Sequence, residues 1–232
     1  AYPGLITRSV GGVYPEIEIR TPTPDESARC YNEYMQDAFQ RKQLGQLKQG
    51  EDVREEGGRV TVNGQTAVMA INALLCRVIF DNNPDHEFFI EESFPLDWMY
   101  PYLSPYGIIM KLNRKPIETF DEDTLQRDHE FWSQYSERLI GNWITDETSV
   151  KEICDFVDKV YIQRDLRGFK GDRKFMRDDN AQKAFSKLRS SLGGVYYHRV
   201  NNAKSSAEQQ RMIREAEFAL RQAFAFCPYS PE

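Results

Sequence analysis

The chain has 232 residues, of which 40% are hydrophobic and 28% charged, a balance typical of a folded globular protein. Its 36 acidic and 30 basic residues are interspersed and give a formal net charge of −6, which argues against nucleic-acid binding, since that function usually needs a concentrated basic face. No apolar run reaches the roughly 20 residues that a membrane-spanning helix needs, so we expect a water-soluble chain without a span.

The four cysteines are widely spaced and include no C-x-x-C pair. Cys76, Cys154 and Cys227 lie in apolar helical patterns, where a free thiol behaves as a small hydrophobic group. We therefore predict buried free thiols ahead of a disulfide pair. None of the three histidines has ligand spacing from a cysteine, so we expect no metal site and no cofactor.

The first predicted helix begins after a largely irregular N-terminal segment. Alternating residues at 15–20 are compatible with a short strand. Thr23 is placed as an N-cap residue, with Pro24 at the first helical position and acidic residues following it. This pattern predicts a helix that ends near Gly45.

A polar link at 46–58 leads into a segment that alternates strand and helix. In chain order we expect a strand at 59–62, an Asn63-Gly64 turn, a buried helix at 65–80, a strand at 87–90, one or two helical turns at 95–103 and a strand at 107–112. The sequence therefore predicts a small α/β (α+β) unit at 1–118.

The composition then changes, and 119–232 is predicted to be an all-helical domain. Helices are expected at 121–143, 148–163, 179–198 and 206–226. Within the first of them, His129 lies on the apolar stripe and is interpreted as a hydrogen-bonded core histidine. His198 is placed at a helix end, where the C-terminal carbonyl groups favour a cation.

The C-terminal helix pair, at about 180–228, has spacings similar to those of a degenerate tetratricopeptide repeat. Ala216, Leu220, Ala223 and Pro228 fit the second helix of such a repeat, and Leu192-Gly193-x-x-Tyr196 fits the first. The same small residues also suit close packing in an ordinary helical hairpin. If the pair is a repeat, it needs a stacked neighbour, and its interaction face would include Leu192, Tyr196, Leu220 and Phe224.

Two groups of residues at 91–106 suggest a binding or catalytic site. Glu91, Glu92 and Asp97 could act as an acid/base pair, although capping of the turns after a strand is the favoured interpretation. Phe94, Trp98, Tyr100, Tyr102 and Tyr106 could form a sugar-binding platform, although aromatic packing is favoured. We assign no catalytic residue; the candidate ligand-binding residues are Glu91, Glu92, Asp97, Trp98, Tyr100 and Tyr102.

Read together, residues 68–72, 79–80, 87–103, 106–114, 168–172 and 185–191 resemble one family. Its members are large bacterial proteins with an N-terminal multi-spanning membrane region related to protein O-mannosyltransferases, followed by a soluble region and tetratricopeptide repeats. The resemblance covers most of 15–228 and implies a parent enzyme that transfers a sugar from a lipid-linked donor. It also implies a location on the extracytoplasmic side of the bacterial inner membrane. The family's catalytic acid lies near its first membrane helices, and nothing here matches that part.

Three functions follow from these observations. The first is a non-catalytic soluble scaffold domain of a membrane-bound glycosyltransferase-like protein, with the membrane domain or further repeats of the same chain as partners. The second is a glycan or small-molecule binding module centred on 91–106. The third is a carboxylate-dependent hydrolase or transferase that uses Asp97 with Glu91 or Glu92.

Overall fold

The computed structural model describes residues 19–91, 96–141 and 143–229, and the chain divides into two compact units, Ala1–His86 and Glu87–Glu232. Each unit is described by itself. The predicted fold class is confirmed: helices with two small sheets make up the N-terminal half, and an all-helical half follows. The sequence prediction divided the chain after 118, whereas the compact units meet after His86, so the second sheet belongs to the helical unit. The predicted strand at 15–20 lies mostly outside the described residues.

Helix α2 (Pro24–Gln43) begins as predicted. The Thr23 side chain accepts a hydrogen bond from the backbone N–H of Glu26, and the Glu26 carboxylate accepts one from the backbone N–H of Thr23. This reciprocal capping box satisfies two amide groups that have no partner within the helix. The apolar face of α2 buries Tyr34 and Ala38 against the rest of the first unit.

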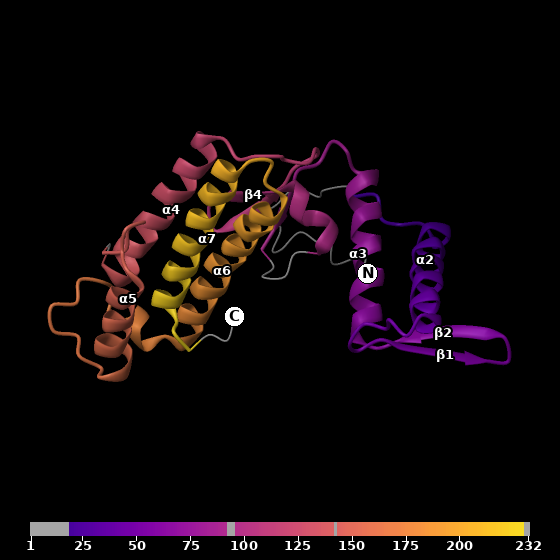
Figure 1. The fold of residues 1–232 in the computed structure, drawn as a ribbon, viewed down its shortest axis with the longest axis horizontal. Coiled ribbons are helices and arrows are strands. Elements are labelled where there is room, and N and C mark those ends of the chain that lie inside the picture. Colours follow the sequence, from indigo (N-terminus) through magenta and orange to yellow (C-terminus); the bar gives the residue numbers. More distant parts are fainter. Residues whose placement is uncertain (1–18, 92–95, 142, 230–232) are drawn as a thin grey trace. The chain divides into compact units, whose positions relative to one another are not determined.

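A two-stranded hairpin lies at one end of α2 and α3 (Gln65–Asn82) (Figure 1). Strand β1 (Asp52–Glu56) pairs antiparallel with β2 (Arg59–Asn63). The two residues between them, Gly57 and Gly58, both have positive φ, at 58° and 77°, as a tight hairpin turn requires. The sequence analysis predicted a polar link at 46–58, where the structure has β1. The strand was missed because it consists largely of charged, exposed residues.

The second unit opens with a three-stranded antiparallel sheet in the order β3–β5–β4. Its strands are β3 (Phe88–Ile90), β4 (Leu103–Tyr106) and β5 (Ile109–Leu112), and the 3₁₀ helix η1 (Asp97–Tyr102) leads into β4. Strands β3 and β5 match predicted strands, whereas β4 was not predicted. It contains Pro105, which lacks an amide donor and is tolerated because β4 is an edge strand.

Helix α4 (Glu122–Ile140) starts at the capping residue Asp121 and stops at Gly141, whose φ of 95° is left-handed. Its buried stripe includes Leu125, Asp128 and Trp132. Helix α5 (Val150–Val157) continues directly as one turn of π-helix, η2 (Asp158–Ile162). The predicted helix at 148–163 is therefore present, with its last turn widened.

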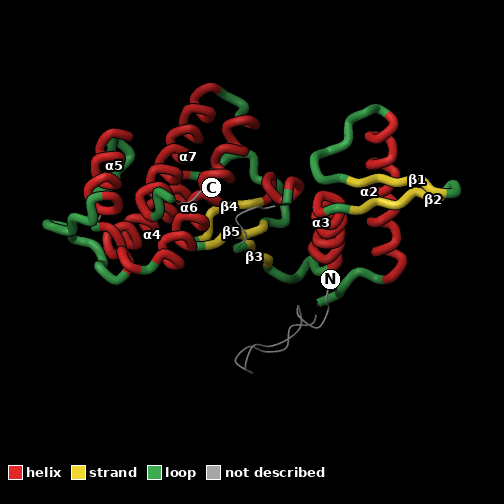
Figure 2. Tube along the Cα trace, turned by 90° about the horizontal axis from the view of Figure 1, so that it is seen from below, coloured by secondary structure: helices red, strands yellow, loops and turns green. Residues whose placement is uncertain are grey.

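Helices α6 (Asp179–Asn202) and α7 (Ser206–Phe226) pack along each other, with α4 beside them and the sheet next to α4 and α6 (Figures 1 and 2). The short 3₁₀ helix η3 (Phe175–Arg177) precedes α6. Tyr161 is buried, and its hydroxyl donates to the carbonyl oxygens of Ala225 and Phe226, at 2.8 and 2.7 Å, at the end of α7. This links η2 to the C-terminus of α7.

Within the described ranges, no helix combines the length and the apolar character that a membrane crossing requires. The cysteines of the described residues are free. Cys30 and Cys227 are buried and Cys76 is half-buried, but the prediction of burial is wrong for Cys154, which is exposed. Ile153 takes the buried position on α5, and the next residue is turned about 100° away from it.

Candidate functional site

Of the acidic residues predicted for 91–106, the structure describes Glu91 and Asp97. Glu91 and Asp97 are both exposed, and Asp97 begins η1. Glu92 lies outside the described residues, as does Phe94. Asp97 and Glu91 do not line the largest cleft described below.

Trp98, Tyr100 and Tyr102 of this segment are half-buried and pack on their neighbours, whereas Tyr106 is exposed. Trp98 and Tyr102 contact each other edge to face, with ring centroids 6.2 Å apart. Tyr100 stacks on His198 at 5.1 Å. His198 does not end its helix, since α6 continues to Asn202, and burial lowers its pKa, with Arg199 adding to the effect. The prediction of a favoured cation at His198 is therefore wrong.

Arg199 of α6 forms hydrogen bonds with the backbone of the same segment, at residues 100–103. Its buried guanidinium donates hydrogen bonds to the carbonyl oxygens of Tyr100, Pro101 and Leu103, at 3.0–3.2 Å. These bonds, all donated by Nη2, fix the backbone of η1 and the start of β4 on α6. This part of the predicted site is thus tied into the packing of the unit.

The four residues of the predicted interaction face divide into two pairs. Leu192 and Tyr196 are fully buried between helices, whereas Leu220 and Phe224 of α7 are 47% and 41% exposed. Leu220 and Phe224 line an apolar groove of about 320 Å³ together with Val150, Ile153 and Cys154 of α5.

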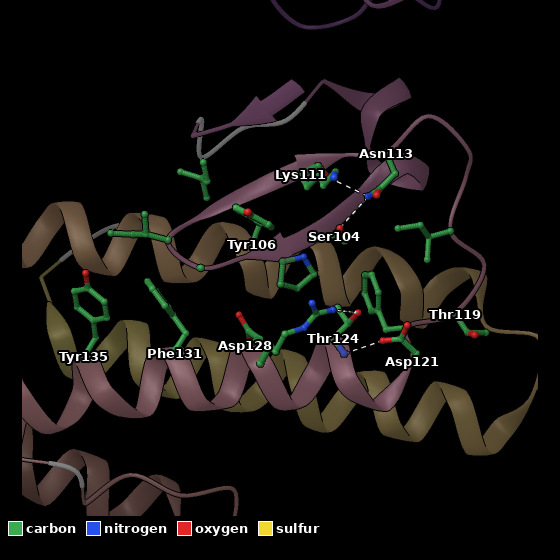
Figure 3. Close-up of a pocket in the computed structure, with 17 residues that line it drawn as sticks. Ser104, Tyr106, Lys111, Asn113, Thr119, Asp121, Thr124, Asp128, Phe131 and Tyr135 are labelled. Atoms are coloured by element: carbon green, nitrogen blue, oxygen red, sulfur yellow. Dashed lines mark hydrogen bonds between the residues drawn. The ribbon is translucent and has the colours of Figure 1, made fainter. Parts of the chain in front are cut away.

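A larger cleft, of about 880 Å³, lies between the β4–β5 hairpin and α4 (Figure 3). This volume is in the range of pockets that bind small molecules. Its lining combines aromatic rings with neutral and charged polar groups: Ser104, Pro105, Tyr106, Gly107, Ile108, Ile109, Lys111, Asn113, Ile117, Thr119, Phe120, Asp121, Thr124, Arg127, Asp128, Phe131 and Tyr135.

Helix α4 supplies one wall of the cleft. Thr124, Asp128, Phe131 and Tyr135 are spaced by four, three and four residues, which places them on one face of a helix. Asp128, Phe131 and Tyr135 project from α4 towards the strands (Figure 3). The helix start is fixed by Asp121, whose carboxylate accepts a hydrogen bond of 2.7 Å from the Thr124 amide.

The β4–β5 turn closes one end of the cleft against Phe131. Gly107 has a φ of 63°, and a Cβ atom there would lie 3.2 Å from the Phe131 ring. Glycine is needed both for the backbone conformation and for this close approach. On the strands, Asn113 donates a 2.9 Å hydrogen bond to the Ser104 hydroxyl.

A buried polar network lies beneath the α4 wall. Asp128 and Arg189 are 2% and 0% exposed, and Arg189 Nη1 lies 2.8 Å from Asp128 Oδ2. The same oxygen accepts a hydrogen bond of 2.8 Å from the Tyr196 hydroxyl, whose pKa is raised by burial. Arg189 Nε donates to Gln222 on α7, and Gln222 donates to Ser136 on α4. The network therefore joins α4, α6 and α7.

Two atoms of this network have no hydrogen-bond partner among the described residues: Asp128 Oδ1 and Arg189 Nη2. A buried polar atom without a partner costs roughly 1–3 kcal/mol, and more when it is charged. Both atoms have almost no accessible surface, and Arg189 is not among the residues that line the cleft, so the two atoms belong to the interior of the unit.

Both carboxylates that line the cleft are already engaged in structural bonds. Asp121 caps α4, and Asp128 pairs with Arg189. They are seven positions apart along the chain, a helical rise of about 10.5 Å, and they do not form a converging acid/base pair.

The sequence prediction covered the cleft only in part. The sequence analysis singled out Tyr106 but did not identify the α4 residues as a polar wall. Asp128 lies next to the apolar stripe of the helix, and a charged residue in that position is usually exposed to solvent. The spacing of Thr124, Asp128, Phe131 and Tyr135 was the available signal. The partner of Asp128 is 61 residues away, and this pairing follows from the packing of α6 on α4.

His129, next to Asp128, occupies the position expected for a hydrogen-bonded core histidine. It is half-buried, with Nε2 2.6 Å from Glu215 Oε2, and this hydrogen bond is the main cause of its raised pKa. Among the residues that the structure describes, no three His, Cys, Asp or Glu side chains are grouped so that they could hold a metal ion. No family model matches the chain, and neither a curated protein nor a solved structure matches it.

Proposed function

We propose that residues 87–232 form a small-molecule-binding module whose ligand occupies the cleft between the β4–β5 hairpin and α4. The observation that carries the proposal is the cleft of about 880 Å³ itself, lined by aromatic rings and by polar side chains that include Asn113 and Thr124. The half-buried rings of Phe131 and Tyr135 add apolar surface next to it. A few polar groups within a largely apolar pocket are typical of ligand sites.

The proposal assigns binding and no bond-making step. A carboxylate-dependent hydrolase needs two carboxyl groups that face each other across a cleft. The exposed Glu91 and Asp97 do not line this one, and Asp121 and Asp128 are held by structural bonds. The geometry therefore favours binding over catalysis.

The test is a screen of the full chain by ¹H–¹⁵N correlation NMR against a chemically diverse library of small molecules. We expect binding compounds to shift the amide signals of Thr124, Asp128 and Tyr106. Phe131→Ala should weaken these compounds, whereas Trp98→Ala, in the segment favoured by the sequence, should leave them unchanged. A library that shifts no α4 signal, or hits lost in Trp98→Ala alone, would contradict the proposal.

A second candidate is the scaffold function that the sequence analysis places first. It is favoured by the exposure of Leu220 and Phe224 beside Val150, which leaves the α5–α7 groove open. The predicted occupant is a further helix of the same parent chain, since a helix fits between two helices with side chains spaced by four residues. Leu220→Glu should then abolish association with such a helix and leave the cleft unaffected.

The wider setting remains a prediction from the resemblance. It places the module in a bacterial membrane-bound glycosyltransferase-like protein, on the extracytoplasmic side of the inner membrane. Under that prediction the module would bind a glycan or hold an acceptor near the membrane domain. The side of the membrane can be measured with a tag at the C-terminus of the parent protein. The measurement compares antibody binding to the tag in intact and in lysed spheroplasts.

A further inference from the structure

We infer that residues 87–232 contain a second ligand site, separate from the cleft, which binds a small organic anion with an aromatic ring. The site is a pocket of about 340 Å³ lined by the end of α4, by α5 and η2, and by the loop that follows η2 at 163–174. This volume lies within the range of small-molecule sites. The inference does not depend on the proposed function, because the pocket and the cleft share no lining residue.

Hydrogen bonds at both ends hold the loop 163–174 in place. At its start, the Asp165 amide donates to the Lys159 carbonyl oxygen at 2.9 Å, and Lys159 Nζ donates to the Arg167 carbonyl oxygen at 3.0 Å. Near its end, the Asp172 amide donates to the Leu139 carbonyl oxygen of α4 at 3.1 Å. A site whose walls are fixed before binding loses less conformational freedom when a ligand enters it.

The backbone around the pocket departs from regular geometry in two places. Element η2 is a turn of π-helix, a form that is frequent at functional sites, and it contributes Lys159 and Val160 to the lining. Arg164, two residues after η2, has a φ of 57°, which is uncommon for a residue other than glycine. Backbone outliers of this kind cluster at ligand-binding sites. They support a functional role for this part of the chain.

Three aromatic rings line the pocket. The ring centroids of Trp143 and Phe156 lie 4.5 Å apart, and those of Phe156 and Phe169 lie 6.4 Å apart. All three side chains are half-buried, so part of each remains accessible. Aromatic rings attract other rings in tilted or offset arrangements at such distances. The pocket therefore suits a ligand with a flat aromatic body.

The charged side chains of the lining carry a net positive charge. Lys159, Arg167 and Lys170 are positive, and Asp165 is negative. The Arg167 guanidinium donates to both Asp165 oxygens, each at 2.8 Å, and these hydrogen bonds lower the pKa of Asp165. Among the residues that the structure describes, no carboxylate lies within salt-bridge distance of the Lys159 or Lys170 ammonium group. Two positive charges are thus left for a ligand.

Two further acidic residues lie close in sequence but do not line the pocket. The Asp158 carboxylate accepts a hydrogen bond from Gln163, and the Asp172 carboxylate accepts one of 2.7 Å from the Lys174 amide. A cationic ligand would meet two like charges and an Asp165 that is already paired. An anion gains charge-assisted hydrogen bonds to the ammonium groups. The pocket therefore selects an anion.

The experiment titrates the full chain with five probes and follows binding by ¹H–¹⁵N correlation NMR. Indole-3-acetate and phenyl phosphate are aromatic anions, indole-3-acetamide is neutral, tryptamine is cationic, and inorganic phosphate is an anion without a ring. We expect the better aromatic anion to bind at least about tenfold more tightly than the other three classes. Its shifts should map to the amides of Gly168, Phe169 and Lys170 and leave those of Thr124 and Asp128 unchanged.

Variants then separate the pocket from the general charge of the loop. Lys170→Gln removes one ammonium group and should lower the affinity of the better aromatic anion about three- to tenfold. Lys174→Gln is the matched control: it removes the same charge from the same loop, but Lys174 does not line the pocket, so the affinity should change less than about twofold. Both residues are exposed, so we expect both variants to keep the native spectrum. Phe169→Leu keeps apolar bulk, removes one ring and should also weaken binding.

Several results would overturn the inference. Tryptamine or indole-3-acetamide binding as tightly as the aromatic anions would show that charge does not select the ligand, and equally tight inorganic phosphate would show that the ring does not. Equal losses in Lys170→Gln and Lys174→Gln would assign binding to the basic loop as a whole. The class of ligand is also wrong if neither aromatic anion shifts the signals of 168–170. None of these results bears on the cleft, whose α4 signals are measured in the same spectra.

Discussion

Asp128 and Arg189 compensate each other's charge in a region that water does not reach. Arg189 also lies over the rings of Trp132 and Phe218, with its guanidinium carbon 5.0 and 5.7 Å from the ring centroids. Such a pair adds little stability compared with a well-packed apolar pair, but removing one partner leaves a buried charge uncompensated. Position 189 therefore needs a positive charge for as long as position 128 carries a negative one.

Arg189→Met keeps the bulk of the side chain and removes its charge. We expect this substitution to lower the free energy of unfolding by about 3–5 kcal/mol, because Asp128 then stays buried without a counter-charge. Urea denaturation followed by circular dichroism measures the change. Arg167→Ala is the matched control: Arg167 pairs with Asp165 at an exposed position, and its loss should lower the free energy of unfolding far less. Similar losses in the two variants would contradict the expected difference.

His129 makes stability depend on pH near neutrality. Its pKa is raised above the ordinary 6.5, chiefly by the hydrogen bond to Glu215. A raised pKa in the folded state means that the folded chain binds the proton more tightly than the unfolded chain does. The contribution is complete below pH 6.5 and is lost as the pH rises through the folded-state value.

We therefore expect the free energy of unfolding to fall as the pH rises from 6.5 through the raised pKa of His129, and to fall less in His129→Gln, which has no proton to lose there. Urea midpoints at several pH values measure the slope. His198→Gln is the matched control; since the pKa of His198 is lowered, its replacement should not remove this decline. An unchanged slope in His129→Gln would assign the decline to other groups.

At the scale of the elements, α6 contains two adjacent glycines that differ in their surroundings. A Cβ atom on Gly194 would have nothing nearer than the Tyr100 hydroxyl oxygen, at 3.9 Å. A Cβ atom on Gly193 would lie 3.1 Å from Leu220 Cδ2. Alanine is favoured over glycine within a helix by about 1 kcal/mol. Alanine at Gly194 therefore tests helix propensity alone, whereas alanine at Gly193 also tests the packing of α6 on α7.

Gly194→Ala should stabilise the chain by about 0.5–1 kcal/mol, raising the melting temperature by roughly 1–4 °C. Gly193→Ala should give less than half of that gain or a loss, because Leu220 must move away. Scanning calorimetry of both variants measures the difference. Equal gains would mean that α7 yields to the added methyl group without cost.

The elements show which parts of the structure can be predicted from the sequence. Helices α2, α4, α6 and α7 follow from their capping residues and helical periodicity, which are local properties. Strands β1 and β4 were missed because their stability comes from pairing: β1 is mostly charged, and β4 contains Pro105. The α4 wall of the cleft follows from helical spacing, but its function depends on Arg189, which the fold brings to Asp128.

At the scale of the whole molecule, the cleft and its supporting network belong to one unit. The lining residues lie between Ser104 and Tyr135, and the network adds residues up to Gln222, all within Glu87–Glu232. Compact units with their own core usually fold alone. We therefore expect the second unit to bind a ligand of the cleft without the first.

A fragment of residues 87–232 should fold cooperatively and give ¹H–¹⁵N signals for α4 that match those of the full chain. Its affinity for any compound that binds the cleft should differ by less than about threefold. A fragment that starts at 119 is the control, since it lacks the β4–β5 hairpin and should lose binding. A fragment 87–232 without dispersed signals would show that the first unit is needed for the fold of the second.

Trp132 is fully buried, with the Arg189 guanidinium over one side of its indole and the Phe131 ring 5.6 Å from it. The chain thus contains its own fluorophore next to Phe131, which lines the cleft. With Trp98 and Trp143 replaced by phenylalanine, the remaining emission should lie at short wavelengths and resist quenching by iodide, an ion that cannot reach the indole. Since Phe131 contacts both the cleft and Trp132, a ligand that moves this ring changes the emission, and occupancy becomes an optical signal that needs no label.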